Sequence, residues 1–381
     1  MTPRSKLPHV GTTIFTIMTN RARELGAINL AQGFPDYDAP EGLKELLAQH
    51  TAAGRNQYAP MTGVAELREQ IARKMEASYG RKLDPETEIT ITLGATEALF
   101  STISALVHPG DDVILFDPAY DSYAPAVILA GGRPIHIPLL PPGFTIDWQR
   151  VRDAISPRLR LVLTNTPHNP TGSILSARDL DTLADILRPT DAVLLADEVY
   201  EHMVFDGARH ASVLAHAELY ERSVACYSFG KTMHATGWRV GYAVAPVDLT
   251  REIRRVHQFN TFAIATPLQY AIADFLKQAP SHSNELSGFY ERKRNLFLDK
   301  LRGSRFTWTP SAGTYFQLLD YSAISSEDDM SFADRLLREA GVASIPVSAF
   351  CQAPPRLTVV RFCFAKNDST LEEAAARLCR M

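Results

Sequence analysis

The residues with the clearest chemical potential lie in the segment 228–241, SFGKTMHATGWRVG. An apolar run at 223–227 precedes it and predicts a short buried strand, so we expect Lys231 in the turn that ends the strand. Burial or a nearby cation lowers the pKa of a lysine toward the neutral, nucleophilic amine. With Arg239 as a second cation, the segment fits a Schiff-base lysine beside a phosphate site. A lysine in a Ser/Gly turn is, however, most often a solvated surface residue.

Three other segments carry polar groups that could complete such a site. Residues 94–98, GATEA, open a predicted helix whose N-terminus attracts anions, or Thr96 simply caps that helix. Asp197 ends an apolar strand, where open α/β sheets place functional groups, or it caps a following helix. The loop 165–172, NTPHNPTG, is stiffened by two prolines and could orient a ligand through an amide, or it is a plain turn.

Arg361 stands inside the apolar run 359–364. An unpaired guanidinium would be costly there, so it requires an anion. That anion is either an internal Asp or Glu or the carboxylate of a substrate, which a guanidinium can bind through two parallel hydrogen bonds. The residue chemistry alone supports both interpretations equally.

Composition narrows the class of protein. With 381 residues, 45% hydrophobic and 22% charged, the chain can form two domains with a large core. A net charge of -4 offers no basic surface for nucleic acid, and no stretch has the length of a membrane span or a signal-peptide core. The four cysteines lack C-x-x-C spacing and fit buried reduced thiols. We therefore expect a cytoplasmic protein with no nucleic-acid, membrane or metal partner.

An alternation of strands and helices must position these residues. Helical patterns cover residues 12–25, 40–52, 64–79 and 250–277. Continuous apolar runs predict strands buried on both faces of a mostly parallel sheet, and hence an α/β domain. The predicted strands are 89–93, 112–116, 134–138, 159–164, 192–196, 223–227 and 239–244.

A second, smaller unit is predicted after the junction 280–283, PSHS. A helix, short strands at 315–319 and 359–364, and a closing helix from residue 370 indicate an α+β arrangement. We predict a large domain over residues 41–280, and a small domain formed by 281–381 with the N-terminal segment 1–40.

Several segments, taken in order, resemble one known family. They are GTTIF at 11–15, NLAQGFPD at 29–36, NQYAPMTG at 56–63, NTPHNP at 165–170, DEVYE at 197–201, the segment 228–241, and RFCFAK at 361–366. Together they resemble the class I/II aminotransferases of the fold-type I pyridoxal phosphate group, most closely the branch of methionine and kynurenine aminotransferases. The resemblance covers essentially the whole chain and implies a large domain with a mixed, mostly parallel seven-stranded sheet.

The resemblance implies pyridoxal 5′-phosphate as the cofactor. By similarity, Lys231 would carry the Schiff base, and Asp197 would pair with the protonated pyridine nitrogen. Tyr200, the third catalytic residue, would hold the ring hydroxyl together with Asn169. The residues that would contact the phosphate are Ala95, Thr96, Ser228 and Arg239, and the ring of Tyr120 would stack on the cofactor.

The resemblance also implies how substrate binds. Arg361, with Gly33 and Asn169, would take the α-carboxylate. Family members are homodimers with shared active sites, so Tyr58 and Phe262 would reach into the site of the second subunit. An apolar and aromatic lining would select the side chain, namely Ile14, Phe15, Tyr37 and Phe262. Kynurenine enzymes have a histidine where this chain has Ala263, which favours the methionine branch.

The implied activity is transfer of the amino group of an L-amino acid to a 2-oxo acid, through Lys231 and ping-pong half-reactions. Methionine and aromatic or other large apolar amino acids would be favoured. A cysteine-S-conjugate β-lyase or a kynurenine-type transaminase is the alternative on this scaffold. A non-enzymatic sensor is disfavoured, because residues 1–28 are too few for a DNA-binding module. The motifs of nicotinamide dehydrogenases, serine hydrolases and zinc proteases are absent from the sequence.

Overall fold

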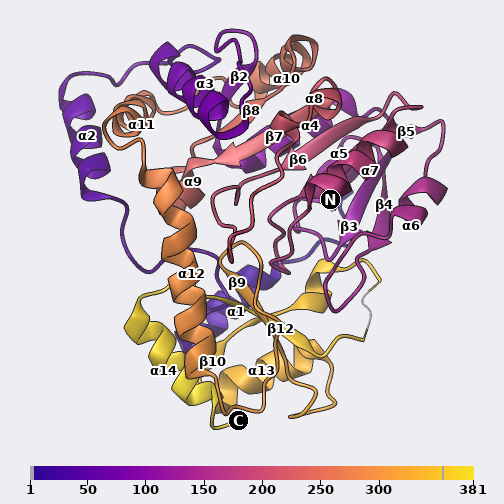
Figure 1. Cartoon of the computed structure of the whole chain (residues 1–381), viewed down its shortest axis with the longest axis vertical. Coiled ribbons are helices and arrows are strands. Elements are labelled where there is room, and N and C mark those ends of the chain that lie inside the picture. The colour runs from indigo at the N-terminus through magenta and orange to yellow at the C-terminus, as the bar shows by residue number, and fades with distance from the viewer. Residues whose placement is uncertain (1–3, 354–355) are drawn as a thin grey trace.

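The computed structural model of the chain describes residues 4–353 and 356–381. Figure 1 shows a large sheet flanked by helices in its upper half and smaller sheets with their own helices in its lower half. The long helix α12 (His282–Lys300) runs from the upper part into the lower one. Across the described ranges, no helix combines the length and the apolar composition needed to cross a membrane. The predicted α/β architecture is confirmed, while the domain boundaries at residues 41 and 280 stay a prediction.

The large sheet contains all seven predicted strands, in the order β2-β8-β7-β6-β5-β3-β4. Of these strands, β8 runs opposite to the other six, so the sheet is mixed but mostly parallel, as predicted. The strands are β2 (Ile89–Thr92), β3 (Asp112–Asp117), β4 (Arg133–Pro138), β5 (Leu159–Asn165), β6 (Val193–Asp197), β7 (Ser223–Ser228) and β8 (Gly241–Val244).

Each strand differs from its predicted bounds by one or two residues, and the largest difference, at β8, has a clear reason. β8 begins at Gly241 rather than at residue 239, because Arg239 has a φ of 55° and therefore cannot continue an extended strand. Lys231 likewise lies not in an irregular turn but in the short helix α9 (Phe229–Thr232), directly after β7.

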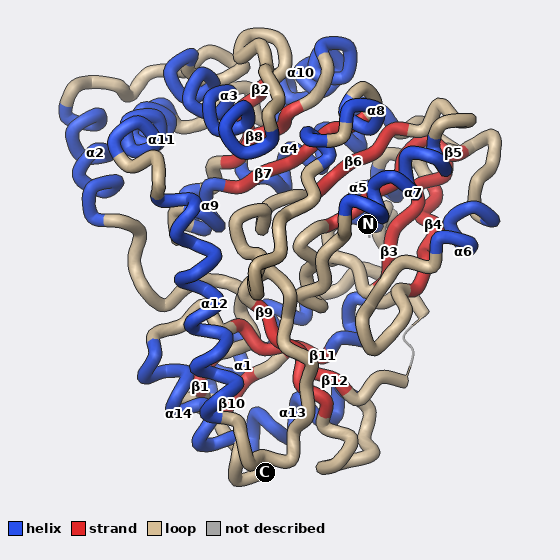
Figure 2. The backbone as a smooth tube through the Cα atoms, in the orientation of Figure 1, coloured by secondary structure: helices blue, strands red, loops and turns tan. Residues whose placement is uncertain are grey.

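Helices cover both faces of the large sheet, as the tube in Figure 2 shows. Successive side chains of a strand point to opposite faces, and in β3 Val113 and Leu115 enter one core while Ile114 and Phe116 enter the other. This two-sided burial explains the continuous apolar runs. The helices of this part are α2 (Glu41–Ala52), α3 (Ala65–Tyr79), α4 (Gly94–Leu106), α5 (Tyr123–Leu129), α6 (Trp148–Asp153), α7 (Ala177–Leu187), α8 (Ala217–Tyr220), α10 (Val247–Asn260) and α11 (Thr266–Gln278).

The single helical pattern predicted over residues 250–277 is wrong in its continuity. The structure has two helices there, α10 and α11, separated at residues 261–265. Phe262 has a φ of 68°, which a right-handed helix does not allow, and a proline occupies the first turn of α11. The break matters because it exposes Phe262 at a corner of the fold.

The lower part is built on a three-stranded antiparallel sheet with the order β11-β12-β9. Its central strand is β12 (Val359–Cys363), which carries Arg361, between β11 (Ile345–Pro346) and β9 (Phe316–Asp320). Besides α12, its helices are α1 (Ile14–Glu24), α13 (Asp329–Glu339) and α14 (Asp368–Leu378).

The N-terminal segment packs against this C-terminal part. β1 (Ile28–Asn29) pairs in parallel with β10 (Val342–Ala343), and the Cys363 N–H donates to the Leu30 carbonyl at 2.8 Å. The carboxylate of Asp36 accepts from the Asn367 N–H at 2.5 Å and from the Thr370 hydroxyl at 2.9 Å, so it anchors the first turn of α14. The helix begins at residue 368, two residues before the predicted start. The chain between Leu30 and Asp36 is thereby held against β12 and α14.

Candidate active site

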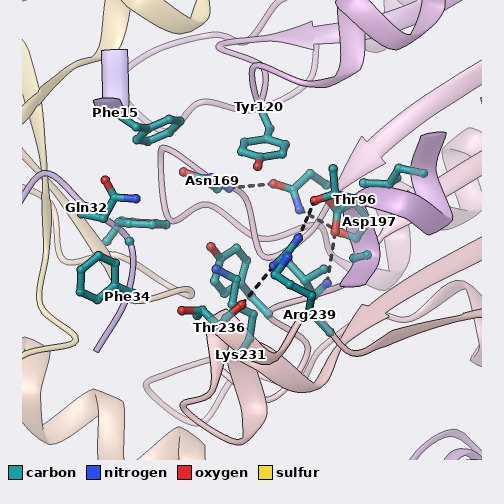
Figure 3. Close-up of a pocket in the computed structure, with 18 of the residues that line it drawn as sticks. Phe15, Gln32, Phe34, Thr96, Tyr120, Asn169, Asp197, Lys231, Thr236 and Arg239 are labelled. Carbon is teal, nitrogen blue, oxygen red and sulfur yellow. Dashed lines mark hydrogen bonds between the residues drawn. The ribbon is translucent and has the colours of Figure 1, made fainter. Parts of the chain in front are cut away.

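A cavity of about 320 Å³ opens at the carboxyl ends of β5, β6 and β7, where parallel sheets place functional groups. Asn165, Asp197 and Ser228 are the last residues of these three strands and all line it. Figure 3 shows side chains from both parts of the fold pointing into this space. Of the predicted site residues, those that line the cavity are Gly33, Ala95, Thr96, Tyr120, Asn169, Asp197, Tyr200, Ser228, Lys231, Arg239 and Arg361.

Lys231 presents its amine to the cavity from α9. Its Nζ donates to the hydroxyl of Tyr315 at 2.8 Å and lies 5.4 Å from the ring centroids of both Tyr200 and Tyr315. Burial lowers the pKa of Lys231 to about 8, and the positive charge of Arg239 acts in the same direction. A neutral, nucleophilic amine is therefore accessible near neutral pH.

Asp197 presents a buried carboxylate that forms no salt bridge within the described part of the chain. Its oxygens accept hydrogen bonds from the Tyr123 hydroxyl at 2.5 Å and from the Val199 N–H at 3.3 Å. Burial raises the pKa of Asp197 to about 6, in spite of these donors. A ligand that brings a positive charge to this carboxylate would relieve the cost of its burial.

The raised pKa of Asp197 predicts how stability depends on pH. The folded protein binds a proton here more tightly than the unfolded chain, so stability is lost as pH rises from about 4 to 6. Asp197→Asn should therefore raise the free energy of unfolding of the ligand-free protein by about 3 kcal/mol at pH 7.5, for roughly two pKa units. At pH 4.5 we expect a much smaller gain.

Urea unfolding of both proteins at the two pH values measures this difference. Asp248→Asn, an exposed change on α10, is the control and should show no such dependence on pH. An equal effect of Asp197→Asn at both pH values would contradict a buried, charged Asp197.

A built anion site lies at the start of α4. The first N–H groups of a helix have no partner within the helix, and Ala95 and Thr96, in the first turn of α4, both line the cavity. Arg239 donates from Nη2 to Thr96 Oγ1 at 3.2 Å. Gly94 has a φ of 70°, a backbone conformation that strains other residues, and a Cβ on it would lie 2.9 Å from the Arg239 guanidinium, which would then have to shift. Helix terminus, guanidinium and hydroxyls together suit a phosphate.

Arg361 is fully buried and its described partners are neutral. It donates from Nη1 to Asn169 Oδ1 and from Nη2 to the Ala31 carbonyl, both at 2.7 Å. Its Nε is buried and has no hydrogen-bond partner among the described residues, and the guanidinium lies 3.9 Å from the ring centroid of Phe316. Burial lowers the pKa of Arg361 to about 10, so it remains charged at neutral pH. Between the two interpretations that the sequence left open, this environment favours an anion supplied by a ligand.

Two predicted site residues lie away from the cavity of their own chain. Tyr58 and Phe262 contact each other edge to face, with ring centroids 5.5 Å apart, and are 86% and 45% exposed. Of the aromatic lining expected from sequence, Phe15 reaches the cavity, whereas Ile14 and Tyr37 do not. The prediction for Tyr37 is wrong because its ring packs edge-on against His234 and Phe289.

Several residues of the site were missed at the level of sequence. The Tyr123 hydroxyl donates a hydrogen bond to Asp197, the Tyr315 hydroxyl accepts one from Lys231, and the ring of Phe316 stacks against the guanidinium of Arg361. Asn165 uses both ends of its amide, donating to the Asp197 carbonyl at 2.9 Å and accepting from the Asn169 N–H at 2.8 Å. The only sequence signal was their proximity to predicted site segments, because aromatic residues in apolar runs read as core.

The donor set fits pyridoxal phosphate. A phosphate site and a buried carboxylate, Asp197, lie at the same cavity as the amine of Lys231 and the ring of Tyr120. A Cβ on Gly94 would press against the Arg239 guanidinium at the start of α4, and Arg361 Nε has no hydrogen-bond partner among the described residues, so it is available for a further anion. These groups match a phosphorylated, basic aromatic ring with an aldehyde that an amine can attack.

Comparison with known proteins agrees with this chemistry. The family model for aminotransferase class I and II matches residues 26–378. The chain is 52% identical to a methionine aminotransferase of Escherichia coli, over 99% of this chain and 97% of that protein. It is 32% identical to kynurenine–oxoglutarate transaminase 1 of Rattus norvegicus, over 93% and 92% of the two chains. A crystal structure of an Escherichia coli protein with a methionine aminotransferase function superposes with a TM-score of 0.98, at 51% identity over 100% of both chains.

The family predicted from the sequence is confirmed by these matches. They cover nearly the whole chain and include both the sheet that carries Lys231 and the strand that carries Arg361. The chain belongs to the class I and II aminotransferases, pyridoxal 5′-phosphate-dependent enzymes that transfer amino groups between amino acids and 2-oxo acids.

Proposed function

We propose that this aminotransferase acts on L-methionine and on other L-amino acids with large apolar or aromatic side chains. One observation carries the proposal. Among the described residues that line the cavity, the cations are Lys231, Arg239 and Arg361. The first two serve the cofactor and the third serves the α-carboxylate, so no cation of this chain remains for an acidic side chain. Phe15, Phe34 and Phe316 contribute apolar surface instead.

The residues of the cavity divide the work of the reaction. Bound pyridoxal phosphate supplies an electron-accepting ring that acidifies the Cα–H of the amino acid. Lys231 Nζ would provide the covalent attachment and, when free, would move the Cα proton as general base and acid. Asp197 would keep the ring nitrogen protonated, and Arg361 would hold the α-carboxylate beside Gly33 and Asn169.

The remaining groups orient the cofactor. Tyr200 and Asn169 would hold the ring hydroxyl, and Tyr120 would lie against the ring. Ala95, Thr96, Ser228 and Arg239 would bind the phosphate. The positions of these residues around one cavity support the assignment.

A panel of amino donors with a fixed 2-oxo acid tests the proposed specificity. We expect kcat/KM for methionine to exceed that for aspartate by about 100-fold, because a side-chain carboxylate buried without a cation costs roughly 3 kcal/mol. Norleucine, which matches methionine in shape but lacks sulfur, should react almost as well. The change in cofactor absorbance in each half-reaction gives the rates. A ranking with aspartate first would refute the proposal.

We also propose that the enzyme is a homodimer in which each chain completes the cavity of the other. Tyr58 and Phe259 are 86% and 85% exposed, and Phe262 is 45% exposed at the corner between α10 and α11. Aromatic side chains exposed to this extent are typical of an interface. Tyr58 and Phe262 would then reach into the second cavity, which explains why they lie outside their own.

Mixing two inactive variants tests the shared site. When Lys231→Ala and Tyr58→Ala chains reassociate at random, half of the dimers contain both chains, and each mixed dimer has one intact cavity. We expect about a quarter of the wild-type activity to return. A mixture of Lys231→Ala with Arg361→Gln is the control and should stay inactive, because both changes affect the cavity of their own chain. Absence of recovery in a confirmed mixed dimer would exclude a shared site.

We further infer a cytoplasmic location from the thiols. All four cysteines are free, and Cys226 and Cys363 are fully buried. The expectation of buried thiols is wrong for Cys379, which is exposed at the end of α14, and for Cys351, which is half-buried. Free thiols are typical of proteins from a reducing compartment, which supports the proposed location.

A further inference from the structure

Tyr315 is the residue in direct contact with the amine of Lys231, yet none of the roles above includes it. It immediately precedes β9 in the lower part of the fold, and its side chain is fully buried. Its hydroxyl oxygen lies 2.8 Å from Lys231 Nζ and 2.7 Å from the carbonyl oxygen of Gly33. One phenol therefore joins the reacting nitrogen to the segment that borders the substrate site.

The directions of these two hydrogen bonds follow from the atoms involved. A carbonyl oxygen can only accept, so the single proton of the Tyr315 hydroxyl is donated to Gly33. The phenol oxygen must then accept a hydrogen from Lys231 Nζ. A neutral amine has two N–H groups and one lone pair, so a fixed N–H restricts where the lone pair of Lys231 points.

Tyr315 does not itself act as the acid or base. Burial raises the pKa of its phenol well above the usual value, and neighbouring tyrosines act in the same direction. The hydroxyl therefore stays protonated throughout the ordinary pH range and continues to donate its hydrogen bond to the Gly33 carbonyl. Its contribution must therefore come from holding a neighbouring group in place.

We propose that Tyr315 is a positioning residue, whose hydroxyl orients the free amine of Lys231 toward the substrate and couples it to Gly33. This inference rests on the proposed function, in which Lys231 Nζ is the reacting amine. Once displaced, that amine must return to one position to take and deliver the Cα proton. A tethered N–H limits its rotation without consuming its lone pair.

The alternative is that Tyr315 serves only as a packing residue. Its ring lies in an aromatic cluster, with centroids 4.9 Å from Phe316, 5.2 Å from Tyr200 and 5.7 Å from Tyr290. Tyr290 is a matched control, because it is equally buried in the same cluster but its hydroxyl contacts His234 at 3.0 Å instead of Lys231. Removing each hydroxyl separates packing from orientation.

The test compares Tyr315→Phe with Tyr290→Phe in the holoenzyme. We expect Tyr315→Phe to lower kcat for methionine by about tenfold or more, with KM changed less than about threefold, since Arg361 is untouched. Tyr290→Phe should leave kcat within about twofold. Equal losses in both variants, or an unchanged kcat in Tyr315→Phe, would overturn the proposal.

A second readout does not depend on turnover. A phenol oxygen that accepts from Lys231 stabilises the ammonium form, so its removal should lower the pKa of Lys231. The pH midpoint for capture of added pyridoxal phosphate by the cofactor-free enzyme should therefore fall in Tyr315→Phe and stay constant in Tyr290→Phe. An unchanged midpoint in Tyr315→Phe would count against the contact.

Two further experiments allow the proposal to be tested even if Tyr315→Phe does not fold or the attachment site differs. If Tyr315→Phe does not fold, difluorotyrosine at position 315 retains the ring and the hydroxyl but weakens the oxygen as an acceptor. A partial loss of kcat then supports the proposal, and wild-type kcat refutes it. Borohydride trapping followed by peptide mapping distinguishes the two levels of failure. A label on another lysine would refute the proposed function, whereas a label on Lys231 with normal Tyr315→Phe kinetics would refute this inference alone.

Discussion

The Lys231→Ala enzyme is expected to bind pyridoxal phosphate without a covalent bond and to lose about 10⁴-fold in kcat, the upper range for a general acid–base residue. The reason is that Lys231 is the only lysine among the described residues that line the cavity. No other amine there can attach the cofactor or move the Cα proton. Borohydride reduction followed by mass spectrometry measures the attachment, and single-turnover absorbance measures the rate.

Two control variants isolate the amine. Lys231→Arg keeps the positive charge but cannot attach the aldehyde under ordinary conditions, so it should fail in the same way. Lys277→Ala removes an exposed lysine near the end of α11 and should behave as wild type. A borohydride-stable cofactor in Lys231→Ala would show that another residue carries it.

The second large effect is expected at Arg361. Arg361→Gln should lower kcat/KM for methionine by about 10²- to 10³-fold, mainly through KM, because losing one partner of a buried charge pair costs roughly 3 to 4 kcal/mol. The described partners of this guanidinium are neutral oxygens, so the substrate carboxylate is the anion that it would lose. Arg361→Lys keeps the charge but loses the two-pronged contact, and should fall between the two.

A substrate without a carboxylate provides the matched control for Arg361. With methioninol as the amine, wild type and Arg361→Gln should show similar rates of cofactor conversion, since neither has a carboxylate to bind. Borohydride trapping at Lys231 should also remain normal, which shows that the cavity is intact. A wild-type KM for methionine in Arg361→Gln would assign the α-carboxylate to another residue.

Much of the large sheet could be predicted from local patterns. Each strand that is covered on both faces appears as a short apolar run between polar or Gly/Pro segments, and β3 is buried at all six positions. Parallel strands bring their carboxyl ends to one edge, so Asp197 and Lys231 could be placed near each other before any contact was known. The prediction failed where one backbone angle decides, as at Phe262 between α10 and α11.

The partners of the site residues could not be predicted in this way. Tyr315 is 84 positions from Lys231, and Tyr123 is 74 positions from Asp197. In the sequence, both tyrosines lie in stretches that read as ordinary core. Their hydroxyl contacts depend on how two elements pack, which no local periodicity records.

The sequence by itself determined which residue types stand at the strand ends, and that Arg361, in an apolar strand, must find an anion. Only the tertiary structure decided that its partners within the chain are the side-chain oxygen of Asn169 and the carbonyl of Ala31, 192 and 330 positions away. The physical reason is the distance along the sequence over which each effect is decided. Strand formation and burial depend on neighbours a few residues apart, whereas the compensation of a buried charge depends on atoms that only the packed fold brings within hydrogen-bond distance.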